Sequence, residues 1–161
     1  MARPLAASLL GWSALFCGIG AAQNLAVCPL SLTQGTPGAV EVSLTNQDGR
    51  DLVALQWDIE IPSRLLAPGA QVQPGPAATD AGKNVYCVGR WDKAMVTYSY
   101  RCIIAGGNQP LHDGVIATIS VLSAPGIKGS KPVRIQRARG VQTNLSAVSL
   151  KTSSSSITIR D

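Results

Sequence analysis

The chain has 161 residues, with 14 Lys+Arg against 9 Asp+Glu and a formal net charge of +5. Its 45% apolar and 14% charged residues exclude global disorder, and a chain of this length most simply forms one domain. The single histidine, His112, excludes most histidine-based metal and proton-transfer sites, and the 4% aromatic content counts against a broad stacking surface.

The first predicted element is a secretory signal peptide over residues 1–22. Arg3 supplies the positive start, residues 5–22 are largely apolar, and Gly20-Ala21-Ala22 has small residues where signal peptidase cleaves. An uncleaved anchor is the alternative, although about 18 residues is the lower limit for a membrane span. We expect cleavage, a mature domain over residues 23–161 without a transmembrane segment, and a secreted, extracellular or cell-surface protein.

Alternation of apolar and polar residues predicts strands along the rest of the chain. In Leu55–Ile61 the apolar residues occupy every second position, and Gln56, Asp58 and Glu60 fall on the other face. Because successive side chains of a strand point to opposite sides of the sheet, this is the pattern of a half-buried strand. Further strands are predicted at 40–44, 96–104 and 115–121, with shorter candidates at 26–33, 83–89, 131–136, 145–151 and 155–160.

Turn residues separate these strands, and no stretch of ten or more residues has a convincing helical period. The long segment 67–82 is rich in Pro, Gly and Ala, and we expect it to cross one edge of the fold. About eight or nine short strands with regular turns predict an all-β protein, a two-sheet β-sandwich.

Four motifs then occur in a recognisable order. Residues 38–46 look like a first core strand, 55–66 contain an aromatic strand followed by Pro-x-x-Leu, 113–121 contain Asp-Gly before an apolar strand, and 156–159 look like a closing strand. Together they resemble the cohesin-like domains of secreted bacterial proteins, over about residues 31–160. The resemblance implies a nine-stranded jelly-roll sandwich related to carbohydrate-binding modules. Cohesins bind dockerin modules through one exposed sheet face and help to assemble polysaccharide-degrading complexes.

The cysteines are four in number, and cleavage of the leader would remove Cys17. In the domains that the chain resembles, cysteines at the places of Cys87 and Cys102 form a cross-strand disulfide, and export permits one. A hairpin tip near Asp92-Lys93 would set Cys87 opposite Tyr98, so this pairing needs an offset, a bulge or a longer loop. Cys28 is then left over. It is either a free thiol, a partner in a disulfide between chains, or a residue that takes the place of Cys87 or Cys102 in the disulfide.

Catalytic and metal-binding constellations are weak. His112 beside Asp113 is either a catalytic base or part of a turn, and the following glycine favours the turn. The only glutamates, Glu41 and Glu60, do not suggest the facing carboxylates of a glycosidase. Zinc spacing and a calcium-loop pattern are absent from the sequence. We predict no enzyme activity, no cofactor and no metal.

Aromatic residues bear on carbohydrate binding, for which two or three rings would stand in a row on one exposed face. Trp57 is in phase with the apolar side of its strand, and Tyr98 and Tyr100 are also expected to point inward. Trp91, near the predicted hairpin tip, is the best candidate for an exposed ring, and the orientation of Tyr86 is undecided. A coplanar, exposed row of Tyr86, Trp91 and Tyr98 would favour a carbohydrate-binding module.

Charge is uneven, since residues 114–161 contain seven basic residues and one acidic residue. The basic residues form either a strip for an acidic partner or a solvated face. Arg134 and Arg137 are an odd number of positions apart, so an undistorted strand would place them on opposite faces. No nucleic-acid motif accompanies them, and we expect no nucleic-acid partner.

The predicted function is that of a secreted, non-catalytic binding or adhesion module of cohesin type. Its expected partner is a dockerin-like or cell-surface protein, or a polysaccharide. A carbohydrate-binding module and a structural component of the cell envelope are the alternatives. The candidate ligand contacts are Tyr86, Trp91, Arg134 and Arg137.

Overall fold

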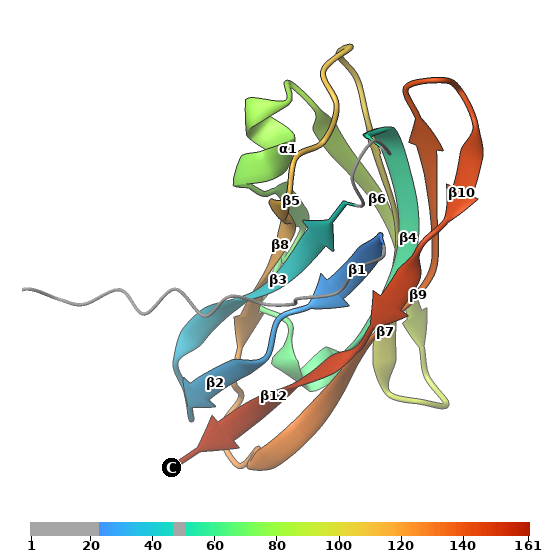
Figure 1. The fold of residues 1–161 in the computed structure, drawn as a ribbon. Coiled ribbons are helices and arrows are strands. Elements are labelled where there is room, and N and C mark those ends of the chain that lie inside the picture. The colour runs from blue at the N-terminus through green and yellow to red at the C-terminus, as the bar shows by residue number, and fades with distance from the viewer. Residues whose placement is uncertain (1–22, 47–50) are drawn as a thin grey trace, which may run out of the picture.

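Two β-sheets packed face to face form the fold in the computed structural model, which describes residues 23–46 and 51–161 (Figure 1). The predicted signal peptide, residues 1–22, lies outside this described part. None of the described helices is long and apolar enough to cross a membrane. The predicted two-sheet jelly-roll class is confirmed.

The first sheet has five strands. In spatial order these are β11 (Lys151–Ser153), β1 (Asn24–Val27), β3 (Pro37–Thr45), β8 (Gly114–Leu122) and β5 (Val72–Pro74).

The second sheet has seven strands. Its order is β2 (Leu30–Thr33), β12 (Ser155–Arg160), β9 (Gly129–Gln142), β4 (Leu52–Pro62), β7 (Thr97–Ala105) and β6 (Asn84–Asp92), with β10 (Ala147–Ser149) pairing to β9.

The strands outnumber the eight or nine that were predicted because two expected strands are divided between the sheets and segment 67–82 contains a further strand, β5. Residues 26–33 separate at Cys28-Pro29, where β1 of one sheet gives way to β2 of the other. Proline has no amide hydrogen for a sheet ladder, so this is a position where a strand can end. The expected strand 145–151 is interrupted at Leu150, which lies between β10 of the second sheet and β11 of the first. Segment 67–82 supplies β5 and the one-turn helix α1 (Pro76–Asp80), and the short 3₁₀ helix η1 covers Ser63–Leu65.

The space between the sheets is filled by apolar side chains, as the alternation predicted. Trp57 is fully buried together with Leu55 and Ile59. Tyr100 is also buried and its hydroxyl donates a hydrogen bond to the carbonyl oxygen of Ala70 at 3.1 Å. Tyr98 is half-buried against the core, with its ring centroid 4.9 Å from that of Tyr100. The inward orientation predicted for these aromatic residues is confirmed.

The β6–β7 hairpin turns later than predicted. Asp92 pairs with Thr97, so the connection is Lys93–Val96 and the expected tip at 92/93 is wrong. The Asp92 carboxylate shapes this turn because its Oδ1 accepts hydrogen bonds from the amides of Ala94 (2.9 Å) and Met95 (3.2 Å). The longer loop sets Cys87 directly opposite Cys102 without an offset or a bulge, and the structure joins them in a disulfide.

Candidate binding face

Four neighbouring strands of the second sheet, β9, β4, β7 and β6, present one side to solvent, which we call the outer face. Residues directly opposite each other on adjacent strands share a face of the sheet. The register gives three cross-strand rows on this side: Tyr86–Ile103–Gln56–Arg139, Val88–Arg101–Asp58–Gln136 and Arg90–Ser99–Glu60–Arg134.

An apolar patch lies at the β6 side of the outer face. It consists of Tyr86, Val88 and Ile103, whose exposed fractions are 61%, 77% and 43%. Tyr86 and Ile103 are cross-strand neighbours, and Val88 follows Tyr86 on the same side of β6. These three side chains do not contribute to the core between the sheets, so the patch is exposed to solvent.

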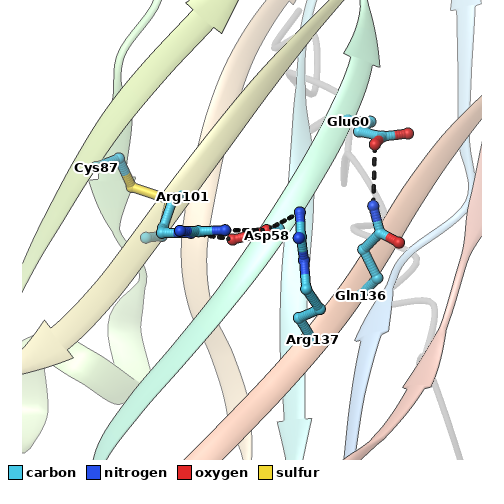
Figure 2. Close-up of polar contacts among 7 residues, drawn as sticks. Asp58, Glu60, Cys87, Arg101, Gln136 and Arg137 are labelled. Atoms are coloured by element: carbon cyan, nitrogen blue, oxygen red, sulfur yellow. Dashed lines mark hydrogen bonds and ion pairs between the residues drawn. A yellow bond between two sulfur atoms is a disulfide. The ribbon is translucent and has the colours of Figure 1, made fainter.

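Beside the apolar patch, Asp58 is held by two arginines from the strands on either side (Figure 2). The Arg101 guanidinium donates from Nε to Oδ1 at 2.9 Å and from Nη2 to Oδ2 at 3.1 Å. Arg137 on β9 also binds Oδ2 of Asp58. The carboxylate is almost fully covered, with 5% of its side chain exposed, whereas the arginine side chains are 60% and 64% exposed.

These contacts perturb the acid–base properties of the pair. The hydrogen bond from Arg101 lowers the pKa of Asp58 below its usual value, and the positive charge of Arg137 acts in the same direction. Burial of the carboxyl opposes this effect, since desolvation penalises the charged form. The same hydrogen bond raises the pKa of Arg101. Asp58 is therefore ionised at neutral pH.

A second carboxylate extends this polar region along β4. Glu60 Oε1 accepts a hydrogen bond from the Gln136 side-chain amide at 2.9 Å (Figure 2), and Arg134 lies 4.0 Å from Oε2. We call Asp58, Glu60, Arg101, Arg134 and Arg137 the charged stripe. It runs next to the apolar patch, so the outer face combines exposed apolar side chains with oriented guanidinium groups.

A β-bulge brings Arg137 onto the outer face. Between the pairs Gln56–Arg139 and Asp58–Gln136, β4 advances by two residues and β9 by three. Arg137 is the extra residue and has a left-handed backbone, with φ of 55°. The expectation that Arg134 and Arg137 lie on opposite faces held only for an undistorted strand. The extra residue shifts the alternation of side chains along β9 by one position, so both arginines are exposed on the same side of the sheet.

Tyr86, Arg134 and Arg137, three of the predicted contacts, therefore share the outer face. Trp91 does not, because it pairs with Tyr98 and points to the opposite side of β6. Trp91 is 44% exposed but lies within the strand rather than at the hairpin tip. The rings of Tyr86, Trp91 and Tyr98 thus form no row on one face, which removes the arrangement that would have favoured a carbohydrate-binding module.

Sequence reasoning missed Val88, Ile103 and the Asp58–Arg101 pair as parts of this face. Alternation alone placed Asp58 outward. The same rule places Ile103 outward, because it lies between the inward Cys102 and Ile104. A branched apolar residue at an outward position, opposite an aromatic one, is the signal that could have revealed the apolar patch.

The disulfide lies on the core side of the two strands that carry the apolar patch. Cys87 and Cys102 have Cα atoms 4.1 Å apart and tie β6 to β7. Cys28 is half-buried outside this disulfide, and its amide donates to the carbonyl oxygen of Glu41 at 3.0 Å. The disulfide therefore holds β6 to β7 on the side of the sheet opposite to Tyr86 and Val88.

The His112–Asp113 segment forms a turn rather than a polar cluster. Asp113 Oδ1 accepts the amide hydrogen of Asn46 at 2.7 Å, the Asn46 side chain donates to the carbonyl oxygen of Leu111 at 2.8 Å, and Gly114 has a φ of 132°. Asp113 thus secures a loop. Across residues 23–46 and 51–161, no three His, Cys, Asp or Glu side chains gather into a group that could hold a metal ion.

Comparison with known proteins identifies the fold. The sequence matches no protein-family model and no curated protein. In structure, the chain is similar to one chain of a type I cohesin–dockerin complex from Clostridium thermocellum. The TM-score is 0.70 at 16% sequence identity, and the match covers 86% of this chain and 99% of that chain.

Two further structures agree with this result. A non-cellulosomal cohesin from the archaeon Archaeoglobus fulgidus has a TM-score of 0.66 at 15% identity, covering 88% of this chain and 93% of the other. A cohesin module of a family 33 glycoside hydrolase from Clostridium perfringens has a TM-score of 0.64 at 10% identity, covering 88% and 98%. The chain has the cohesin fold, and the resemblance found in its sequence is confirmed at that level.

Proposed function

We propose that this chain is a non-catalytic protein-binding module that recognises its partner through the outer face. The observation that carries the proposal is the apolar patch of Tyr86, Val88 and Ile103 beside the charged stripe. Contiguous exposed apolar side chains with a polar rim are typical of protein interfaces. Tyrosine and arginine are also the residues that most often dominate binding energy.

The fold supports the same class of function. Several modules with this fold were solved in complexes with dockerins, including those of Clostridium thermocellum and Acetivibrio cellulolyticus. We propose a dockerin-like module or another cell-surface protein as the partner here. Fold does not determine the partner, so the proposal depends on the residues of the outer face.

The electrostatics of the outer face indicate what kind of partner surface fits. Asp58 is covered, whereas the guanidinium groups of Arg101 and Arg137 extend into solvent. Arg139 stands in the same row as Tyr86 and adds a further positive charge. A partner that offers an apolar side chain to Ile103 and carboxylates to these arginines would match both regions, because arginine binds carboxylates with two parallel hydrogen bonds.

Export fits this role. We propose that residues 1–22 direct secretion and that the binding module, residues 23–161, acts outside the cell or at its surface. The Cys87–Cys102 disulfide is consistent with an oxidising compartment.

The test is capture of a partner by the immobilised protein from the culture supernatant of its own organism, run beside a panel of insoluble polysaccharides. We expect one protein, identified by mass spectrometry and then bound directly in calorimetry, and no retention on glycan. Ile103→Asp should reduce that affinity about tenfold or more, because it places a charge in the apolar patch.

Leu145→Asp is the matched control. Leu145 is 82% exposed and lies in the β9–β10 turn, away from the patch, so its replacement should leave affinity unchanged. Retention on polysaccharide alone would overturn the proposal. Equal binding by the wild type and Ile103→Asp would show that the partner uses another surface.

A further inference from the structure

The edge strand β6 differs from the other strands that end the two sheets. β11 and β5 have three residues each, and β2 has four. β6 has nine residues, contains no proline and keeps an unbroken register with β7 from Asn84 to Asp92. Proteins usually blunt an exposed edge by shortness, proline or a bulge, because a regular edge can pair with another chain. β6 uses none of these three devices, and its two charged residues, Arg90 and Asp92, both lie in its last three positions.

The backbone groups that β6 offers can be assigned from its pairing. Cys87 and Cys102 have Cα atoms 4.1 Å apart, which is the narrow spacing of a non-hydrogen-bonded antiparallel pair. The N–H and C=O groups of Cys87 therefore point away from β7, as do those of Val85, Gly89 and Trp91 at alternate positions. Within residues 23–46 and 51–161, β6 pairs with β7 alone, and no other backbone hydrogen bond engages these four residues.

The space along this edge is open. A groove of about 670 Å³ adjoins β6. It is lined by residues 85–88 of β6, by Gln71 and Val72, by Gln56 of β4 and by residues 100–103 of β7. Its walls include side chains from both faces of β6.

We propose that β6 pairs antiparallel with β6 of a second copy of this chain, about a two-fold axis at Val88. Val88 is the midpoint of the nine-residue strand, so this register overlaps the whole strand. It also satisfies the hydrogen-bond pattern. A two-fold axis at Val88 sets Cys87 opposite Gly89 of the second copy and Val85 opposite its Trp91, and all four carry outward-pointing backbone groups.

The side chains are self-complementary in this register. On the outer face, Val88 meets Val88 of the second copy, and Tyr86 lies opposite its Arg90, a pairing that favours a cation–π contact. On the other face, Val85 lies opposite the Trp91 ring, which is 44% exposed in the single copy. No like charges oppose each other in this register, and the apolar and cation–π pairs on the two faces make β6 complementary to a second copy of itself.

Dimerisation would join the two outer faces into one continuous sheet surface with two apolar patches side by side. This inference does not depend on the proposed function, because it concerns the isolated protein. Two linked partner sites would raise the apparent affinity for a partner that is itself repeated.

The experiment is light scattering with size-exclusion chromatography across a concentration series into the millimolar range, followed by amide hydrogen exchange. We expect the mass to double at high concentration. The amides of Val85, Cys87, Gly89 and Trp91 should become protected with it, while those of Tyr86 and Val88, bonded to β7, are protected throughout. A monomer at every concentration, or a dimer in which the four amides stay unprotected, would overturn the inference.

Charge replacement at the axis gives a second test. Val88→Asp and Val88→Lys each place like charges face to face and should weaken the dimer about tenfold or more. Mixing the two variants should restore a heterodimer, which excludes misfolding as the cause. Ile103→Asp, on the neighbouring strand, should weaken partner binding about tenfold or more, as above, without changing the dimer. A mixture that stays monomeric would contradict pairing at Val88.

Discussion

Asp58 and Arg101 lie directly opposite each other on β4 and β7, and the guanidinium of Arg101 binds both carboxylate oxygens. Arg137 reaches the same carboxylate from β9. One nearly buried acid thus connects three adjacent strands beneath the outer face. The arrangement orients two exposed arginines and also contributes to the stability of the sheet.

Replacing Asp58 by asparagine should lower the free energy of unfolding by roughly 1–2 kcal/mol. Asn keeps the shape of the side chain but loses the charge and one of the acceptor oxygens, and the exposure of the arginines limits the loss. Urea denaturation monitored by Trp fluorescence measures the change. Glu60→Gln is the control, because Arg134 lies 4.0 Å away and the expected loss is only a few tenths of a kcal/mol. A larger effect for Glu60→Gln would reverse this ranking.

The stability that Asp58 provides should depend on pH. Its pKa in the folded state lies below the ordinary value of 3.8, chiefly because of the Arg101 hydrogen bond. The stabilisation is therefore fully present at a pH above the ordinary pKa of 3.8. It is lost as the pH falls through the lower pKa of the folded state. Unfolding free energies of the wild type and Asp58→Asn should differ by a constant amount near neutrality and converge in acid. A gap that widens on acidification would be inconsistent with the lowered pKa.

Removal of the disulfide by a Cys87→Ala and Cys102→Ala double substitution should cost about 3 kcal/mol of stability, the chain-entropy value for a loop of this size. The cysteines are 15 positions apart, so the bond closes a short loop in the unfolded chain. Denaturation with and without a reducing agent measures the effect. The reductant should shift the wild type and leave the double variant unchanged. Non-reducing mass spectrometry also checks the pairing, and a bond that includes Cys28 would contradict it.

Gly89→Ala should destabilise the hairpin by roughly 1–3 kcal/mol, the usual cost of overpacking. A Cβ at residue 89 would come 2.3 Å from Cε1 of Tyr98, whose ring covers this glycine. The ring also packs against Tyr100, so it cannot move without losing that contact. Thermal unfolding checks the prediction. In a Tyr98→Leu background the same substitution should cost much less, and an unchanged cost would rule out the clash.

Val96→Gly should stabilise the protein by about 1 kcal/mol. Val96 has a φ of 52°, a left-handed conformation that is costly for a β-branched residue and free of strain for glycine. Its carbonyl accepts hydrogen bonds from the amide of Ser63 at 3.1 Å and from the Ser63 hydroxyl at 3.0 Å, which hold the turn in place. The melting temperature is the measurement. Val96→Ala, still a non-glycine residue, should recover less of this strain, and equal gains would contradict the backbone explanation.

The sequence predicted the fold because period-2 alternation reports burial directly. Leu55–Ile61 shows this, since its apolar positions are buried around Trp57. The hairpin tip could not be predicted in the same way. Val96 is a residue type that disfavours positive φ, so no glycine or asparagine marked the true turn, whereas Asp92-Lys93 looked like one.

The outer face was only partly predictable for a similar reason. Arg134 and Arg137 were recognised as candidates, but nothing in Arg137-Ala138-Arg139 signals that its first residue adopts a left-handed backbone. The bulge arises from the pairing of β9 with β4, a tertiary relationship. Without that pairing, it cannot be decided from the sequence which face of the sheet each arginine occupies.

The pairing of β2 also constrains the order in which the domain can assemble. β2 is joined in the sheet to β12 alone among the described strands, and the two run parallel with Leu30 opposite Ile157. These residues are separated by most of the chain, and contacts of high sequence separation form slowly because loop-closure entropy must be overcome first. Because residues 30–33 find their only described strand partner at the end of the chain, we expect β2 to dock late in folding.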